Sequence, residues 1–268
     1  MTTDNVHAYE LDPHIAEIYD VVEADEDDVG LIRRLIGARG ELRVFEPFAG
    51  TGRILIPLAA DGHCVVGMDR ARGMLDRARV KVAVLPGEVG CRISLIQADA
   101  VTSSWPRGFD LIILGANCLY ELATPEEQEG CIADAATALN PGGLLYLDNN
   151  HMEGELDVTW RTQGIHASPS PNGTCADGTR LAAAIETVWY DAPRRLVRFR
   201  RTITIWSPDG GVQTITYIEQ KHPPSTGEMR SWLTAHGFII EREYGDRKGN
   251  PYTDASGRAI FWARLPVQ

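Results

Sequence analysis

A glycine-rich turn carries the clearest chemical signal in the sequence. Residues 44–53 read Val-Phe-Glu-Pro-Phe-Ala-Gly-Thr-Gly-Arg, an apolar strand that runs into a turn and opens a helix. Gly50 and Gly52 let the backbone pass close beneath a ligand, where a Cβ atom would obstruct it. Many tight strand-to-helix turns contain two glycines for conformational reasons alone, so the turn predicts a ligand site only together with its context.

The context is an acidic residue, Asp69, which follows Gly52 by seventeen residues and ends the next predicted strand. A carboxylate in this place can accept hydrogen bonds from both hydroxyls of a ribose. The alternative is that Asp69 only caps the following helix. A dinucleotide dehydrogenase would need a third small residue in the turn, where this chain has Leu55, so hydride transfer is disfavoured.

The elements that must position these residues alternate between strands and helices. Such alternation predicts a mostly parallel sheet with helices on both faces. The predicted strands cover residues 43–47, 63–68, 93–97, 109–114 and 144–147. The predicted helices cover residues 53–60, 72–82 and 125–139, and two more, over 11–22 and from the acidic stretch 23–28 to about 38, precede the sheet.

The composition and the pattern of predicted elements change after His151. Residues 164–178 are rich in Pro, Ser, Asn and Gly and predict a loop, and hairpin turns then separate three strands at 184–190, 196–206 and 212–220. Apolar residues alternate along the middle strand, which predicts an antiparallel sheet packed on one side. A helix over 225–236 and strands at 238–244 and 259–265 complete the chain.

We therefore predict an α/β fold, with a seven-stranded, mostly parallel sheet and an antiparallel sheet inserted between its fifth and sixth strands. The predicted domains are an N-terminal helical cap (1–40), a cofactor-binding core (41–150), the inserted sheet (151–224) and a C-terminal segment (225–268) that completes the core.

Four motifs in order resemble the class I (Rossmann-like) S-adenosylmethionine-dependent methyltransferases, over residues 46–148. They are the glycine turn, Asp69-Arg70 with Met74-Leu75, Ala98-Asp99-Ala100, and Asn140-Pro141-Gly142-Gly143. The resemblance implies S-adenosylmethionine as cofactor and S-adenosylhomocysteine as product. It places Gly50 and Gly52 at the methionine part, Asp69 at the ribose, Met74, Asp99 and Ala100 at the adenine, and Asn117 beside the sulfonium. The remaining predicted cofactor-binding residues are Tyr19, Glu46, Ala49, Arg53 and Arg70.

A looser resemblance extends to glycine N-methyltransferase-like enzymes and to amine-methylating enzymes of natural-product pathways, antibiotic biosynthesis included. Its features include Tyr9 and Tyr19 near the N-terminus, Gly115-Ala116-Asn117, the inserted sheet and Tyr244-Gly245-Asp246. The segment Asp148-Asn149-Asn150-His151-Met152 departs from the pattern of these relatives, which leaves the amine substrate open. The candidate catalytic residues are Tyr9, Asn117, Tyr120 and His151.

These candidates have plainer alternatives. Tyr19 can simply belong to the apolar face of the first helix, and His151 can be a packing residue. In the catalytic interpretation, the tyrosine rings exclude water and the imidazole of His151 takes a proton, because imidazole titrates near neutrality.

Methyl transfer to a neutral amine needs mainly alignment, whereas a hydroxyl acceptor needs a base or a metal to remove its proton. The sequence has no obvious cluster of metal ligands, so we expect no metal and predict N-methylation of a small molecule. The alternatives are O- or C-methylation of a small natural product and, more distantly, a non-catalytic scaffold that only binds the cofactor.

Composition excludes other classes of partner. With 26 Lys and Arg against 37 Asp and Glu, the net charge of -11 would repel a phosphate backbone, so no nucleic acid is expected. The chain has neither a signal peptide nor a long apolar run, which predicts a cytoplasmic protein without membrane contact. Five scattered cysteines predict no disulfide framework.

The inserted sheet would cover a pocket or form the interface of a homo-oligomer.

Overall fold

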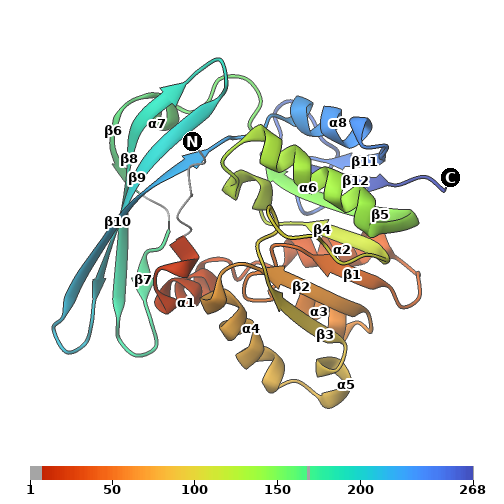
Figure 1. The fold of residues 1–268 in the computed structure, drawn as a ribbon, viewed down its shortest axis with the longest axis horizontal. Coiled ribbons are helices and arrows are strands. Elements are labelled where there is room, and N and C mark those ends of the chain that lie inside the picture. The colour runs from red at the N-terminus through yellow and green to blue at the C-terminus, as the bar shows by residue number, and fades with distance from the viewer. Residues whose placement is uncertain (1–7, 168–169, 268) are drawn as a thin grey trace. The chain divides into compact units, whose positions relative to one another are not determined.

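The computed structural model describes residues 8–167 and 170–267, which fall into two compact units (Figure 1). The sheet unit contains the chain up to Ala24, Leu122–Thr124 and Glu155–Pro223. The core unit contains Asp25–Glu121, Pro125–Gly154 and Pro224–Gln268. The region predicted as one N-terminal cap is thus divided, because helix α1 (Pro13–Val22) lies in the sheet unit and α2 (Asp27–Ile36) lies in the core unit.

The core unit is built on the predicted seven-stranded sheet. Its strands lie in the order β11-β12-β5-β4-β1-β2-β3, and β12 runs antiparallel to both of its neighbours. Their bounds are β1 (Arg43–Glu46), β2 (Cys64–Asp69), β3 (Ile93–Gln97), β4 (Phe109–Leu114), β5 (Leu139–Asn150), β11 (Ile239–Tyr244) and β12 (Arg258–Arg264). The strand order reverses between β1 and β4, and the carboxyl ends of the strands at such a switch point are where open α/β sheets bind ligands.

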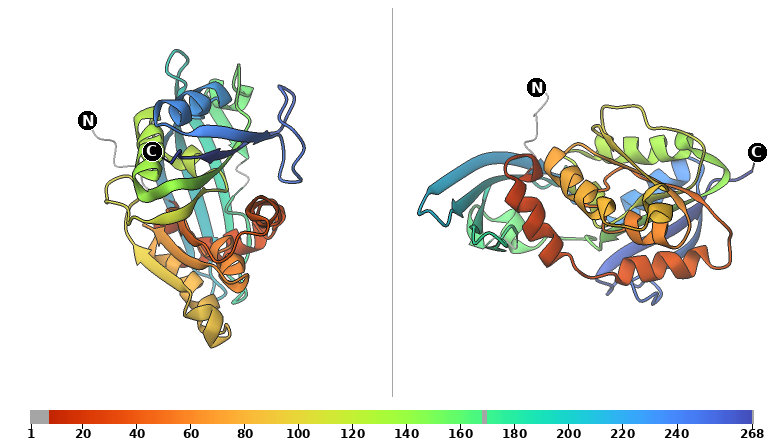
Figure 2. Two further views of the ribbon diagram at one scale, coloured as in Figure 1. Left: turned by 90° about the vertical axis from the view of Figure 1, so that its right-hand side faces the viewer. Right: turned by 90° about the horizontal axis from the view of Figure 1, so that it is seen from below.

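Helices cover both faces of this sheet, as Figure 2 shows. They are α2, α3 (Leu55–Ala60), α4 (Arg72–Ala83), the short α5 (Gly87–Gly90), α6 (Pro125–Ala138) and α8 (Thr226–Ala235), with the 3-10 turn η2 (Cys118–Glu121) after β4. On one face, α2 and α3 bury Ile32 and Leu58 against residues of the sheet such as Leu111. On the other, the ring of Phe45 stacks on that of Phe109 with 4.9 Å between centroids. Among the described residues, no helix is long and apolar enough to cross a membrane.

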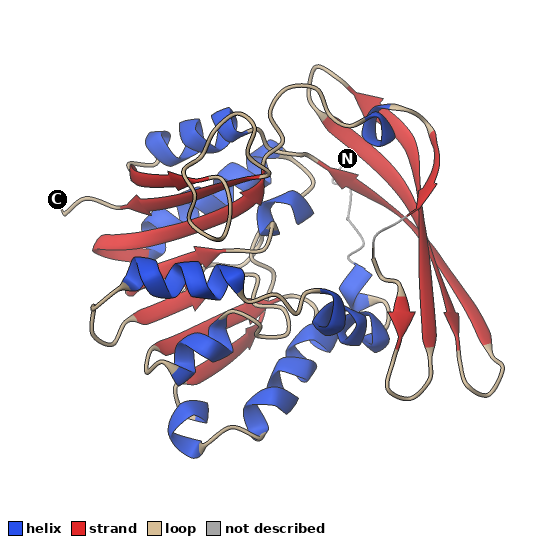
Figure 3. Ribbon diagram, turned by 180° about the vertical axis from the view of Figure 1, so that it is seen from behind, coloured by secondary structure: helices blue, strands red, loops and turns tan. Residues whose placement is uncertain are grey.

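The sheet unit contains the predicted antiparallel sheet, whose strands Figure 3 shows in red. The order is β10-β9-β8-β6, and β7 pairs with β8. The elements are η1 (Ala8–Glu10), α7 (Val158–Arg161), β6 (Gly164–Ala167), β7 (Gly173–Thr174), β8 (Arg180–Asp191), β9 (Leu196–Trp206) and β10 (Val212–Lys221). The prediction of a loop over 164–178 was wrong where β6 and β7 form. Antiparallel pairing with β8 stabilises these two short strands, although their Pro- and Gly-rich composition does not favour strands.

Helix α1 packs on one face of the inserted sheet. Its Ile15 and Ile18 are buried together with Leu181, Ile203 and Ile205 of the strands. The predicted alternation along β9 is therefore confirmed, since Val197, Phe199, Ile203 and Ile205 of that face are buried. Arg201 shares the apolar row and forms an ion pair with the buried Glu219 of β10.

Candidate functional site

The glycine turn joins β1 to α3 in a conformation that requires glycine. Gly50 has φ +53° and Gly52 has φ +80°, both in the left-handed region. A Cβ atom added to Gly50 would lie 3.2 Å from Cε of Met74, whereas one added to Gly52 would lie 2.9 Å from Cδ1 of Ile56. A side chain at Gly50 would therefore crowd Met74, a predicted adenine contact, and one at Gly52 would crowd Ile56.

The carboxylate of Asp69 connects this turn to the start of α4. Its Oδ2 accepts a hydrogen bond of 2.8 Å from the backbone N–H of Gly50, and its Oδ1 accepts one of 2.8 Å from Ala71. Each carboxylate oxygen can accept more than one hydrogen bond, so these two contacts do not preclude hydrogen bonds from ribose hydroxyls. Helix capping and ribose binding, which the sequence left as alternatives, are compatible in this geometry.

Predicted adenine contacts lie at the carboxyl ends of β2 and β3. Arg70 Nη1 lies 3.1 Å from Asp99 Oδ2, and Asp99 Oδ1 accepts the backbone N–H of Val101 at 2.9 Å. The carbonyl of Ala100 accepts a buried hydrogen bond of 2.8 Å from the indole of Trp105. These contacts order the two strand ends, and Met74 and Ala100 are buried.

Glu46 ends β1 as a buried carboxyl group, with 4% of its surface exposed. Burial raises its pKa well above the ordinary value, and the neighbouring carboxylates Asp28 and Asp69 add to the rise while the charge of Arg53 opposes it. Its Oε2 has no hydrogen-bond partner among the described residues. This buried oxygen fits a ligand that carries a cationic or N–H donor group. Ala49, also buried, donates its N–H to the carbonyl of Met68 at 2.8 Å.

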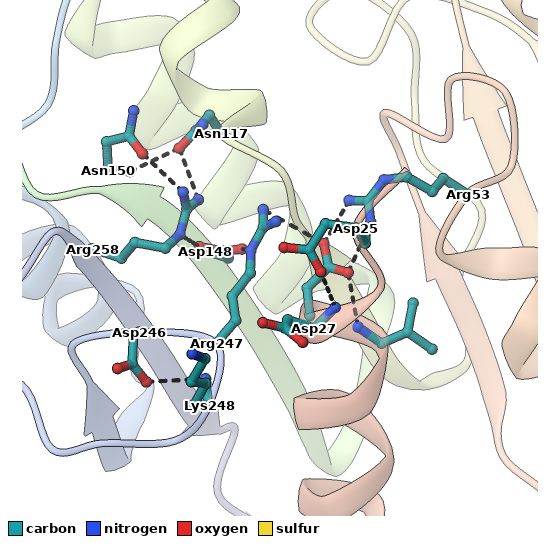
Figure 4. Close-up of polar contacts among 12 residues, drawn as sticks. Asp25, Asp27, Arg53, Asn117, Asp148, Asn150, Asp246, Arg247, Lys248 and Arg258 are labelled. Carbon is teal, nitrogen blue, oxygen red and sulfur yellow. Dashed lines mark hydrogen bonds and ion pairs between the residues drawn. The ribbon is translucent and has the colours of Figure 1, made fainter. Parts of the chain in front are cut away.

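Arg53 takes part in a buried ion-pair network (Figure 4). Its Nη1 donates to Asp28 Oδ1 at 2.8 Å and to the carbonyl of Asp25 at 2.7 Å. Arg247 Nη2 lies 3.5 Å from Asp28 Oδ2, and Arg247 Nε donates to Asp148 at 2.9 Å. Although burial alone would raise the pKa of Asp28, the hydrogen bond from Arg53 and the charges of Arg53 and Arg247 outweigh it and lower that pKa.

Sequence reasoning missed this network. Arg247 was not singled out, Asp28 was noted only within an acidic stretch, and nothing in their spacing relates either residue to Asp148. Arg53 bonds to Asp25 and Asp28, which lie before and at the start of α2, and its predicted role in cofactor binding stays a prediction.

Asn117 lies at the carboxyl end of β4 on a strained piece of backbone. Ala116 and Asn117 both have positive φ, 52° and 62°, which is uncommon for residues other than glycine and is often found at functional sites. The N–H of Asn117 donates to the carbonyl of Asp148 at 3.1 Å, and its own carbonyl accepts the N–H of Tyr120 at 2.9 Å. The structure thus joins Asn117 and Tyr120 to the end of β5.

His151 follows β5 directly and is held by groups that the sequence did not suggest. Its Nδ1 lies 3.1 Å from the hydroxyl of Thr226 and 3.1 Å from that of Tyr252. Its backbone N–H donates to the carbonyl of Gly257 at 3.0 Å. Within the described ranges, no three His, Cys, Asp or Glu side chains are grouped as metal ligands.

Tyr9 and Tyr19 lie in the sheet unit, where the structure brings them together. Their rings meet edge to face, with 5.8 Å between centroids and an interplanar angle of 86°. Tyr9 also packs against the apolar cluster that α1 forms with the inserted sheet. Their predicted contacts with cofactor and substrate stay predictions.

Comparison with known proteins agrees with this geometry. Residues 44–143 match the model of a methyltransferase domain. The CcbJ methyltransferase of Streptomyces caelestis superimposes with a TM-score of 0.74 at 19% identity, over 96% of this chain and 98% of that one.

Two further solved structures share the fold. The sugar N-methyltransferase KedS8 of Streptoalloteichus sp. has a TM-score of 0.68 at 16% identity, over 99% of each chain. CalS10, an amino pentose methyltransferase of Micromonospora echinaspora solved with S-adenosylmethionine bound, has a TM-score of 0.58 at 20% identity, over 97% of this chain and 92% of that one.

The chain thus contains a region that matches a methyltransferase domain, and its fold is shared with solved methyltransferases. These similarities support S-adenosylmethionine as the cofactor of the chain.

Proposed function

We propose that the chain methylates the amine nitrogen of a small molecule, such as an amino acid, an amino sugar or a natural-product intermediate. The observation that carries the proposal is the imidazole of His151 at the carboxyl end of β5, beside the strand end that carries Asn117. The activities of KedS8, a sugar N-methyltransferase, and of CalS10, an amino pentose methyltransferase, support it.

The basicity of an imidazole suits the removal of a proton from a protonated amine. An alkylammonium group has a pKa of about 10, so a histidine can take its proton in a rapid pre-equilibrium. An aliphatic hydroxyl has a pKa of about 15, near that of water, which is far beyond the reach of an imidazole. S-adenosylmethionine supplies the electrophilic methyl group, which leaves sulfur as the bond to nitrogen forms and yields S-adenosylhomocysteine.

The side chains of the core unit then have separate tasks. Asp69, Met74 and Asp99 would hold the nucleoside, and Gly50 and Glu46 would border the methionine part. When Nδ1 of His151 donates its proton to the hydroxyl of Thr226, Nε2 carries the lone pair that receives the substrate proton. Most of the acceleration comes from alignment of donor and acceptor at about 3 Å.

Incubation with labelled S-adenosylmethionine and a panel of amines, amino sugars and phenols tests the proposal, with the product identified by mass. We expect methylated amines, and we expect His151→Asn or Tyr9→Phe to lower turnover by about 10–100-fold. Turnover should rise with pH in parent and variants alike as the substrate ammonium loses its proton. Methylated phenols alone would instead indicate an oxygen acceptor. A loss of about 10³-fold or more confined to His151→Asn would indicate that an essential base, and not alignment, supplies most of the acceleration.

We also propose that the chain forms a homo-oligomer through the face of the inserted sheet that lies opposite to α1. Ile165 and Ile218 lie in one cross-strand row there and are 76% and 44% exposed, and Val212 at the edge is 63% exposed. Sedimentation velocity of the parent and of Ile218→Lys checks this proposal, since a charge in the interface should produce monomers. The cytoplasmic location stays a prediction from the sequence.

A further inference from the structure

Two asparagine side chains at neighbouring strand ends are held by one arginine. Arg258 of β12 donates from Nη1 to Asn150 Oδ1 at 2.8 Å and from Nη2 to Asn117 Oδ1 at 3.0 Å. Asn117 Oδ1 also accepts the backbone N–H of Asn150 at 2.7 Å. Figure 4 shows both amide oxygens turned toward the guanidinium group.

The chemistry of the donors decides how the two amides are oriented. A guanidinium group and a backbone N–H only donate hydrogen bonds, so each of them must face an oxygen. Neither amide can be flipped without placing its NH₂ group against these donors. The NH₂ groups of Asn117 and Asn150 consequently face away from Arg258, and no hydrogen bond within the described ranges uses them.

The arginine that holds the amides is itself fixed. Its Nε donates to Asp148 Oδ1 at 2.6 Å, and the other oxygen of that fully buried carboxylate accepts from Arg247. The left-handed backbone of Ala116 and Asn117 adds a second constraint. The donors are thus pre-organised and lose little freedom when a ligand binds.

We propose that the NH₂ groups of Asn117 and Asn150 form a two-donor site for an oxygen of the methyl-accepting substrate. The inference rests on the proposed function and narrows it. An amide NH₂ donates and cannot receive an ammonium group, so the site selects a hydroxyl, carbonyl or carboxylate oxygen. Asn150 ends β5 and His151 follows it, so both residues lie at the carboxyl end of this strand. The proposed substrate therefore carries both an amine and an oxygen, as an amino alcohol or an amino acid does. The cofactor's own carboxylate offers the same chemistry, and the experiment has to separate the two sources.

The test compares trans-2-aminocyclohexanol with cyclohexylamine as methyl acceptors for the full chain. We expect the parent to prefer the amino alcohol in kcat/KM by about tenfold or more, the scale of one or two hydrogen bonds. In Asn150→Ala this preference should fall toward unity. Arg258→Lys, which keeps a charge near Asp148 but lacks the planar fork, should show the same loss. The control is Arg264→Gln, at the other end of the strand that carries Arg258. It breaks an exposed ion pair with Glu241 of β11 and should keep the parental preference.

Calorimetry with S-adenosylhomocysteine and with 5′-methylthioadenosine, which lacks the carboxylate, distinguishes a substrate oxygen from the carboxylate of the cofactor. Unchanged affinities in Asn150→Ala support a substrate oxygen. A tenfold loss for S-adenosylhomocysteine alone overturns the proposal in favour of the cofactor carboxylate. Equal rates on the two amines in the parent overturn the donor pair but leave the proposed function standing, whereas the absence of any methylated amine refutes the proposed function itself.

Discussion

Replacing Asp69 with alanine tests where the ribose of the cofactor lies. The carboxylate accepts two backbone N–H groups at 2.8 Å each, and a carboxylate oxygen can accept more than one hydrogen bond, so these contacts are compatible with ribose binding. Loss of a charged acceptor for the ribose should weaken binding of S-adenosylhomocysteine by about 2–3 kcal/mol, which is roughly a 30–150-fold rise in Kd.

The structure adds a cost in stability that the sequence did not indicate. The sequence alone suggests that Asp69→Ala leaves the fold intact, but the N–H groups of Gly50 and Ala71 both lose their acceptor. Because the site is only partly buried, water can replace some of this bonding, and we expect about 1–2 kcal/mol less free energy of unfolding. The variant should therefore fold and still bind poorly.

Calorimetry with S-adenosylhomocysteine and urea unfolding measure the two effects separately. Asp76→Ala is a matched control, because this exposed carboxylate of α4 pairs with Arg72 and Arg79 at the surface. We expect the control to change either quantity by less than about 1 kcal/mol. A folded Asp69→Ala protein that binds S-adenosylhomocysteine as tightly as the parent would show that our placement of the ribose is wrong.

Three further predictions concern the turn and the buried carboxyl groups. Gly52→Ala should lower the free energy of unfolding by about 1–2 kcal/mol through its positive φ, whereas Gly40→Ala, where a Cβ meets nothing within 4 Å, should be nearly neutral in the same urea titration. Burial raises the pKa of Glu46, so the parent should lose stability as the pH rises above about 4.5, and Glu46→Gln should lose this dependence; equal slopes between pH 4.5 and 8 would contradict the assignment. Arg53 and Arg247 lower the pKa of Asp28 against the effect of burial. The contribution of Asp28 to the free energy of unfolding is therefore complete above pH 3.8 and is lost as the pH falls through its lower pKa in the folded state. Asp28→Asn should cost about 3 kcal/mol at pH 7, with a smaller difference below pH 3.8, and a pH-independent difference would argue against the ion pair.

Much of the core could be predicted because its signals are local. The strands β3 and β4 agree with the predicted ranges 93–97 and 109–114, since buried parallel strands appear in a sequence as short apolar runs bounded by turn residues. The glycine turn and Asp69 could be predicted for the same reason. Gly50 and Asp69 are nineteen residues apart, and a single strand–helix–strand unit brings them into contact.

The substrate side of the site depended on tertiary structure. Arg258 reaches Asn117 across 141 positions of the chain, and Tyr252 reaches His151 across 101. The first contact exists because β12 pairs with β5 in a register that sets Arg258 opposite Asn150. The sequence by itself determined the cofactor side, where neighbours in space are near neighbours in the chain. The orientation of Asn117, Asn150 and His151 was decided by strand pairing, because the partners of a side chain at a strand end come from whichever distant segment the sheet places beside it.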